Sequence, residues 1–195
     1  MRRVFAGLLV FMWMTAVGWA APTGFRVEGD ARAWEEVGQA LARLASLRSY
    51  RARVDLGQGQ TMAVEFVNPD RVRMVVAGGE MEIVRVGQQQ RFRMAGGPWQ
   101  CVATVPMPEV PTGRPAEGET AVTIHRGPEA QVGGERTRTY RYWFGTRLES
   151  VMRLYVSVRT GLPRRLEMLD ARGRTEVTVD YGDFNAPIQI ELPPC

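Results

Sequence analysis

Few residues of this chain have the side chains and spacing for acid–base, nucleophilic or metal chemistry. The chain has one histidine, His125, and two cysteines, Cys101 and Cys195. These three residues cannot supply the four ligands of a structural zinc site. His125 stands beside Arg126 at the end of an expected strand, which favours a solvated surface residue over a catalytic base.

The remaining polar residues form no catalytic motif. The glycine pairs fall between expected strands and not before a helix, so no phosphate-binding loop is indicated. No serine stands in a nucleophile elbow. Asp170, Asp180 and Asp183 lie in or beside expected turns, where carboxylates commonly accept hydrogen bonds from backbone N–H groups. We therefore expect a protein that is not an enzyme and uses no metal or cofactor.

The N-terminus has the pattern of a secretory signal peptide. Met1-Arg2-Arg3 precedes the apolar run 4–17, and small residues follow, which predicts cleavage after Ala20. A membrane anchor is the alternative, but the run is shorter than the roughly 20 residues of a spanning helix. We expect residues 1–20 to be removed, leaving a periplasmic or secreted, soluble domain over residues 21–195.

Export makes a disulfide between the two cysteines plausible, because the compartment is oxidising. A Cys101–Cys195 bridge would tie the last residue of the chain to the middle of a sheet. Closing a loop of about 94 residues would stabilise the fold by roughly 4–5 kcal/mol at most. Two free thiols are the alternative.

The charge of the chain does not indicate nucleic-acid binding. The formal net charge is +4, and it is about +2 without Arg2 and Arg3. All 25 basic residues are arginine. This bias fits either recognition of phosphate and lipid head groups by guanidinium groups or codon usage in a GC-rich genome.

Hydrophobic spacing predicts one helix followed by many strands. Trp34, Val37, Leu41 and Leu44 recur at helical spacing, which predicts an amphipathic helix over residues 33–48 with Asp30 as its cap and two glutamates in its first turn. From Tyr50 onward the period changes to two. Alternating runs at about ten-residue spacing then predict an antiparallel sheet of about ten strands.

The last third of the chain carries the clearest alternation. Runs at 151–158, 164–168 and 175–181 predict a meander with one apolar face, and Ile188, Ile190 and Leu192 predict a closing strand. Its residues include "TGLP" and "VTVDYGDFN.PI.I.LP", and the first strand reads "SYRARV". Together with "PDRVRM" at 69–74, these patterns resemble the LolA-like lipoprotein-carrier superfamily, which includes LolA, LolB and the LppX and LprG lipoproteins.

The resemblance implies an α+β fold in which a strongly curved antiparallel sheet, an unclosed half-barrel, wraps the N-terminal helix and a short lid. Val105–Gly118 occupies the place of the family's lid helices, but its four prolines favour a surface loop over a lid. In the family's carriers an inner arginine latches the lid, and Arg43 is the position most like it.

The function that the resemblance implies is binding, and carriage, of a lipid or the acyl chains of a lipoprotein in the periplasm, by a monomer that meets membrane proteins transiently. The methionines of the apolar face favour an adaptable cavity, although a filled core is the other interpretation. The expected lining residues are Val54, Leu56, Met62, Val64, Phe66, Met74, Ile83, Phe92, Met94, Leu154, Val156, Leu166 and Met168. The competing hypothesis is an envelope protein-interaction or stress-sensing domain on the same scaffold, without lipid cargo.

Overall fold

One sheet dominates the molecule. The computed structural model describes residues 25–57, 59–102, 119–145 and 150–195. These residues contain one α-helix, α1 (Ala31–Ser46), a short 3₁₀ turn at Ala77–Gly79 and thirteen strands. The strands are β1 (Arg26–Gly29), β2 (Ser49–Asp55), β3 (Thr61–Val67), β4 (Arg71–Val76), β5 (Met81–Val86), β6 (Gln89–Met94), β7 (Gln100–Val102), β8 (Ala121–Arg126), β9 (Ala130–Val132), β10 (Glu135–Phe144), β11 (Val151–Ser157), β12 (Pro163–Leu169) and β13 (Thr175–Gly182).

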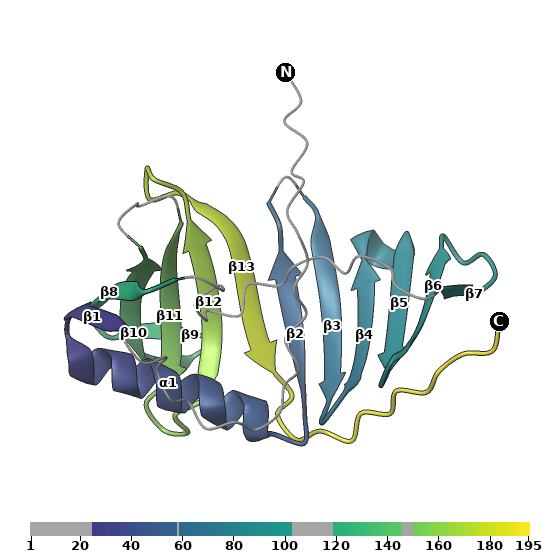
Figure 1. Cartoon of the computed structure of the whole chain (residues 1–195), viewed down its shortest axis with the longest axis horizontal. Helices are drawn as coiled ribbons and strands as arrows, with labels where there is room; N and C mark the ends of the chain where they lie inside the picture. Colours follow the sequence, from purple (N-terminus) through teal and green to yellow (C-terminus); the bar gives the residue numbers. More distant parts are fainter. Residues whose placement is uncertain (1–24, 58, 103–118, 146–149) are drawn as a thin grey trace.

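The sheet is open at both ends. Its strand order is β1-β8-β10-β11-β12-β13-β2-β3-β4-β5-β6-β7, and β9 pairs only with β10 (Figure 1). Every pairing is antiparallel except that of β1 with β8. The sheet curves without closing, so the predicted unclosed half-barrel is confirmed. The expected number of about ten strands was too low, because β1, β7 and β9 are only three or four residues long and show no alternation.

Turn residues set the register between strands. In the two-residue hairpin between β9 and β10, Gly133 and Gly134 have φ values of +56° and +78°. A type I′ turn requires positive φ at both central positions, which glycine adopts without strain.

Helix α1 begins and ends two residues earlier than predicted. Asp30 is the cap: its Oδ1 accepts a hydrogen bond from the Ala33 backbone N–H at 3.0 Å. Because the helix begins directly after this cap, Glu35 and Glu36 lie beyond its first turn, and the prediction that they occupy that turn was wrong. The predicted apolar stripe is confirmed, since its four members, Trp34, Val37, Leu41 and Leu44, are all buried.

The helix packs on one half of the sheet. Its backbone lies closest to β1, β8, β11 and β12, and its side chains also contact β10 (Figure 1). Trp34 stacks on Phe25 at 6.0 Å between ring centroids and meets Tyr142 edge-on at 5.8 Å. Tyr140, fully buried under the helix, donates a hydrogen bond to the Glu36 carboxylate. This half is therefore a conventional core of helix on sheet.

The last ten residues cross the ends of the strands instead of joining the sheet. Residues 186–195 contain no strand, so the prediction of a closing strand was wrong. Burial still alternates there, with Ile190 almost fully buried. The prolines at 187, 193 and 194 lack the N–H groups that a ladder needs. The segment is held instead by Ser49 Oγ on the Ala186 carbonyl (2.6 Å) and by Arg71 on the Ile190 carbonyl (2.9 Å).

The segment ends at a disulfide between Cys195 and Cys101, whose Cα atoms lie 5.8 Å apart. Pairing of the two cysteines was predicted, but its place was wrong. Cys101 lies on β7, which is the edge of the sheet and not its middle, because β8 lies near the opposite end of the strand order. Figure 1 shows the C-terminal segment running below β2–β6 to this edge.

Candidate functional site

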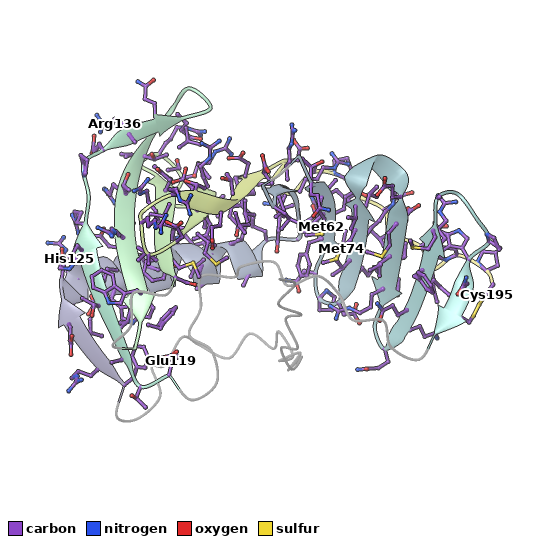
Figure 2. The ribbon with its side chains drawn as sticks, turned by 90° about the horizontal axis from the view of Figure 1, so that it is seen from above. Met62, Met74, Glu119, His125, Arg136 and Cys195 are labelled. Atoms are coloured by element: carbon purple, nitrogen blue, oxygen red, sulfur yellow. A yellow bond between two sulfur atoms is a disulfide. The ribbon has the colours of Figure 1, made fainter. Side chains whose placement is uncertain are left out.

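The candidate site is the inner face of β2–β6. Cross-strand partners share a face, and the register sets Val54 opposite Met62, Val64 opposite Met74, Met74 opposite Ile83, and Ile83 opposite Phe92. We call this set the inner apolar face; it comprises Val54, Met62, Val64, Phe66, Val72, Met74, Met81, Ile83, Phe92 and Met94. Figure 2 shows Met62 and Met74 on the inside of the curved sheet.

This face is closed in the structure. Val54, Met62 and Ile83 expose 1% of their surface or less. Phe92 is half-buried, whereas Met94, at the end of β6, is 53% exposed. A ligand would therefore enter only where side chains move, and the unbranched methionines are the residues that reorient most easily.

Three of the other five expected lining residues lie in the part of the core that α1 covers. Leu154, Val156 and Leu166 are buried in the same cluster as Trp34 and Leu41 of α1, and Met168 is half-buried. Leu56 follows the end of β2 and packs against the edge of this core. All thirteen expected residues except Met94 and Met168 thus lie in or against one core cluster, and they divide into a half covered by α1 and the inner apolar face of β2–β6.

The outer face of the same strands is a ladder of ion pairs. Arg51 on β2 binds Glu65 on β3 (2.8 Å), and Glu65 also meets Arg73 on β4 (3.4 Å). Glu82 on β5 then accepts hydrogen bonds from Arg73 (2.7 Å) and from Arg93 Nε on β6 (2.8 Å). The charges alternate in sign from strand to strand. This arrangement stabilises cross-strand pairing on a face that meets water.

Glu82 is the most buried carboxylate of the ladder, with 8% of its side chain exposed. Burial alone would raise the pKa of Glu82, but hydrogen bonds from Arg73 and Arg93 outweigh it and hold the pKa below the ordinary 4.5. Glu36 on the helix shows the same balance: burial acts to raise its pKa, but the hydrogen bond from Tyr140 and the charge and hydrogen bond of Arg126 outweigh burial and lower it. Burial, followed by that bond to Glu36, raises the pKa of Tyr140 to about 12.

A hollow of about 550 Å³ also lies on the outer face, where β13, β2, β3 and β4 meet. Its lining includes Ala63 and Gly182, whose small size leaves the space open, and the surrounding charges are balanced: Arg51, Arg53 and Arg73 against Glu65, Asp180 and Asp183. The hollow selects neither anions nor cations by net charge.

Arg43, the expected lid latch, points to a turn. Its Nη1 donates to the Thr160 carbonyl at 3.3 Å, in the turn between β11 and β12. Glycine at position 161 permits this approach, since a Cβ there would overlap Arg43 Nη1 unless the arginine side chain moved. Residues 105–118, the expected lid or loop, lie outside the described residues, as does the signal peptide, so the latch remains a prediction.

Sequence reasoning missed a charged residue of the inner face, Arg85. Register sets Arg85 opposite Val72 on one side and Gln90 on the other. It shares a face with Met81 and Ile83 at two-residue spacing, so the alternation used for those residues also predicts its position. Burial lowers the pKa of Arg85, and the nearby Asp70 carboxylate only partly opposes that effect.

The other described polar residues give little support for acid–base or metal chemistry. His125 is exposed, as predicted, with its ring 5.6 Å from that of Trp143. Within the described ranges, no three residues of the types His, Cys, Asp and Glu are grouped to hold a metal ion. The same ranges contain no helix with the length and apolar character needed to cross a membrane.

Solved structures with this fold include a lipoprotein and a complex of two proteins. The lipoprotein LppX of Mycobacterium tuberculosis matches 84% of this chain over its own full length, with a TM-score of 0.62 and 14% identity. In the MucA/MucB complex of Pseudomonas aeruginosa, the match covers 80% of this chain and 56% of the other, with a TM-score of 0.52 and 14% identity. A LolA-superfamily protein of Nitrosomonas europaea superposes less closely, with a TM-score of 0.33 and 12% identity.

No protein-family model matches the chain, and no curated protein matches its sequence. LppX is one of the proteins that the sequence patterns predicted this chain to resemble. The predicted resemblance is therefore confirmed at the level of the fold.

Proposed function

We propose that this protein binds the acyl chains of a lipid or lipoprotein on the inner apolar face. The main support for the proposal is that α1 covers only one half of the sheet and leaves the inner face of β2–β6 beyond it. Helix α1 packs against β1, β8, β10, β11 and β12, while the inner side chains of β2–β6 continue the same apolar surface beyond it. Burial of acyl carbons there would stabilise a complex by about 0.8 kcal/mol per CH₂.

The methionines make this face suitable for ligands of varied shape. Met62, Met74 and Met81 lie on three neighbouring strands, and each has several rotatable bonds. Movement of these side chains would open space between the strands without breaking backbone hydrogen bonds. The closed face of the structure is then the unliganded form.

We further propose that the mature chain works outside the cytoplasm, as a periplasmic or secreted protein. The disulfide between Cys101 and Cys195 supports an oxidising compartment. The N-terminal pattern of a signal peptide points in the same direction. A carrier in that compartment would release its acyl chains to a membrane partner.

Uptake of a fluorescent fatty acid tests acyl binding directly. Met74→Glu places a carboxylate on the inner apolar face, and we expect at least about tenfold weaker uptake because a charge must be desolvated there. Val75→Glu is the matched control, since Val75 neighbours Met74 but faces outward beside the hollow. Equal uptake by both variants, at wild-type level, would remove the inner apolar face from consideration.

A protein-interaction domain is the second candidate function. It is favoured by the MucA/MucB complex, in which a protein with this fold is bound to another protein. This function requires no acyl ligand. A folded wild-type protein that takes up no fatty acid would favour it over lipid binding.

A further inference from the structure

A second candidate binding site lies on the outer face of the sheet, in the hollow where β13, β2, β3 and β4 meet. Its volume of about 550 Å³ falls within the roughly 300–1,000 Å³ of ligand pockets. The floor includes Ala63, which is exposed, and Val75, which is half-buried. These two residues are direct neighbours in the register of β3 and β4. The hollow therefore offers an accessible apolar floor, on the opposite side of the strands from the inner apolar face.

One part of the lining is the ion-pair ladder, whose charges are already paired. Glu65 binds Arg51 at 2.8 Å and also meets Arg73 at 3.4 Å. Arg51 meets Asp183 at 3.1 Å as well, and Arg73 donates a hydrogen bond to Glu82 at 2.7 Å. A charged ligand group would have to displace one of these pairs, so the ladder does not select a ligand by its charge.

Arg53 on β2, the third arginine of the lining, has no such partner. Its register neighbour Asp180 accepts hydrogen bonds from Arg165 through both oxygens, at 2.7 and 3.1 Å. Asp55, two residues along the same face of β2, accepts a hydrogen bond from the Gly57 backbone N–H at 2.8 Å. In the part of the chain that the structure describes, no hydrogen bond or ion pair reaches the Arg53 side chain, and the residue is exposed. Although the formal charges of the lining are balanced, the Arg53 guanidinium is thus available to an anion from outside the chain.

The spacing of the hollow fits an extended peptide. Arg53, Ala63 and Val75 are successive register partners on β2, β3 and β4. Neighbouring strands lie about 4.8 Å apart, so Arg53 and Val75 are separated by roughly 10 Å across the strands. In a polyproline II conformation, side chains three residues apart lie on one side of the chain, about 9.3 Å from each other. A carboxylate that meets Arg53 would therefore place the side chain three residues away over Val75.

We propose that the outer hollow binds an extended acidic segment of a partner protein, in which a carboxylate meets Arg53 and an apolar side chain three residues away packs on Ala63 and Val75. Charge complementarity selects the acidic residue, and the accessible floor admits the chain. The site lies on the opposite face from the acyl ligand, so the proposal does not depend on acyl binding. It gives the protein-interaction function a surface and a partner chemistry. The competing explanation is a solvated surface arginine beside a depression that binds nothing.

Selection from a random library of eight-residue peptides displayed on phage tests the proposal, with the full chain as the target. We expect the enriched peptides to carry an acidic residue three positions from an apolar one. One enriched peptide is then synthesised with a fluorescein label and titrated by fluorescence polarisation. Arg53→Gln should weaken its binding about tenfold, as expected for the loss of a charge-assisted hydrogen bond. Arg172→Gln is the control, because Arg172 is an exposed arginine outside the lining of the hollow.

Two substitutions at neighbouring positions separate the outer hollow from the inner apolar face. Val75→Glu places a carboxylate on the floor of the hollow, so it should abolish peptide binding and leave fatty-acid uptake unchanged. Met74→Glu should have the reverse effect, because Met74 faces inward. Failure of the peptide experiment alone therefore leaves acyl binding standing, and failure of fatty-acid uptake alone leaves the hollow standing.

The variants are first verified as folded by circular dichroism, and Arg53→Gln should fold like the wild type because it removes no described side-chain contact. A selection that enriches no acidic peptide on the wild type would overturn the proposal. So would an enriched peptide that binds Arg53→Gln as tightly as the wild type, or one that Arg172→Gln weakens equally. Loss of peptide binding in folded Met74→Glu would place the peptide on the inner face and not in the hollow.

Discussion

At the scale of single residues, the outer-face ladder makes Glu82 the side chain whose loss should cost most. Glu82→Gln keeps the shape but removes the charge that Arg73 and Arg93 share. Both guanidinium groups retain some contact with water, at 42% and 35% exposure. We therefore expect a loss of about 2 kcal/mol in the free energy of unfolding, measured by urea denaturation.

The matching control is Glu28→Gln. Glu28 pairs with Arg26, but the two side chains are 51% and 69% exposed. Such surface pairs contribute less than about 1 kcal/mol. Equal losses in the two variants would contradict the importance assigned to burial in the ladder.

Acid should destabilise the protein through the same carboxylates. Glu82 and Glu36 have folded-state pKa values below the ordinary 4.5. Their contribution to stability is therefore fully present above about pH 4.5 and is lost as the pH falls through the lowered pKa values. We expect the free energy of unfolding to fall from pH 5 to pH 3, and to fall less steeply in Glu82→Gln. If the free energy of unfolding fell equally steeply with pH in the wild type and in Glu82→Gln, Glu82 would not be a source of the acid sensitivity.

At the scale of elements, α1 depends on its cap. Asp30→Ala removes the acceptor for the Ala33 backbone N–H, and we expect a loss of about 1 kcal/mol in stability. Asp30→Asn keeps a side-chain oxygen and should recover most of the loss, as measured by thermal or urea unfolding. A loss of the same size in both variants would assign the effect to the charge of Asp30, which lies 3.8 Å from Arg126.

The sequence predicted the helix and strands whose apolar residues recur at regular spacing, and it did not reveal the elements that lack such spacing. The stripe of Trp34, Val37, Leu41 and Leu44 fixed the inward face of α1, and alternation identified the inner residues of β2–β6. Short edge strands such as β1 and β7 have too few residues to show a period. The alternation of apolar and polar residues at 188–192 predicted a strand that the structure does not contain. An extended segment shows this two-residue alternation of buried and exposed side chains whether or not its backbone forms hydrogen bonds with a neighbouring strand.

The candidate site was predicted in part for the same reason. Met74 and Phe92 follow from alternation, whereas Arg85 was overlooked because an arginine at an apolar position breaks the hydrophobic pattern that defines a strand face. The division between residues under α1 and residues beyond it depends on the order of the strands. That order places β13 beside β2, a long-range pairing that local spacing does not reveal.

At the scale of the whole molecule, the disulfide joins the C-terminal segment to the edge of the sheet. It closes a loop with a sequence separation of 94 residues. Cys101→Ala with Cys195→Ala should lower the free energy of unfolding by up to about 4–5 kcal/mol. Hydrogen exchange should also rise in residues 191–195, beyond the contact of Arg71 with Ile190. Unchanged stability in the double variant would mean that packing alone holds the segment.

The central claim is that the inner apolar face holds acyl chains. Its most direct measurement is organic extraction of the protein purified from its native compartment, followed by lipid mass spectrometry. A Met74→Glu, Phe92→Glu variant, verified as folded, is extracted in parallel. The account predicts about one acyl lipid per wild-type chain and none in the variant. A wild-type protein free of lipid, or the same lipid in both samples, would contradict it.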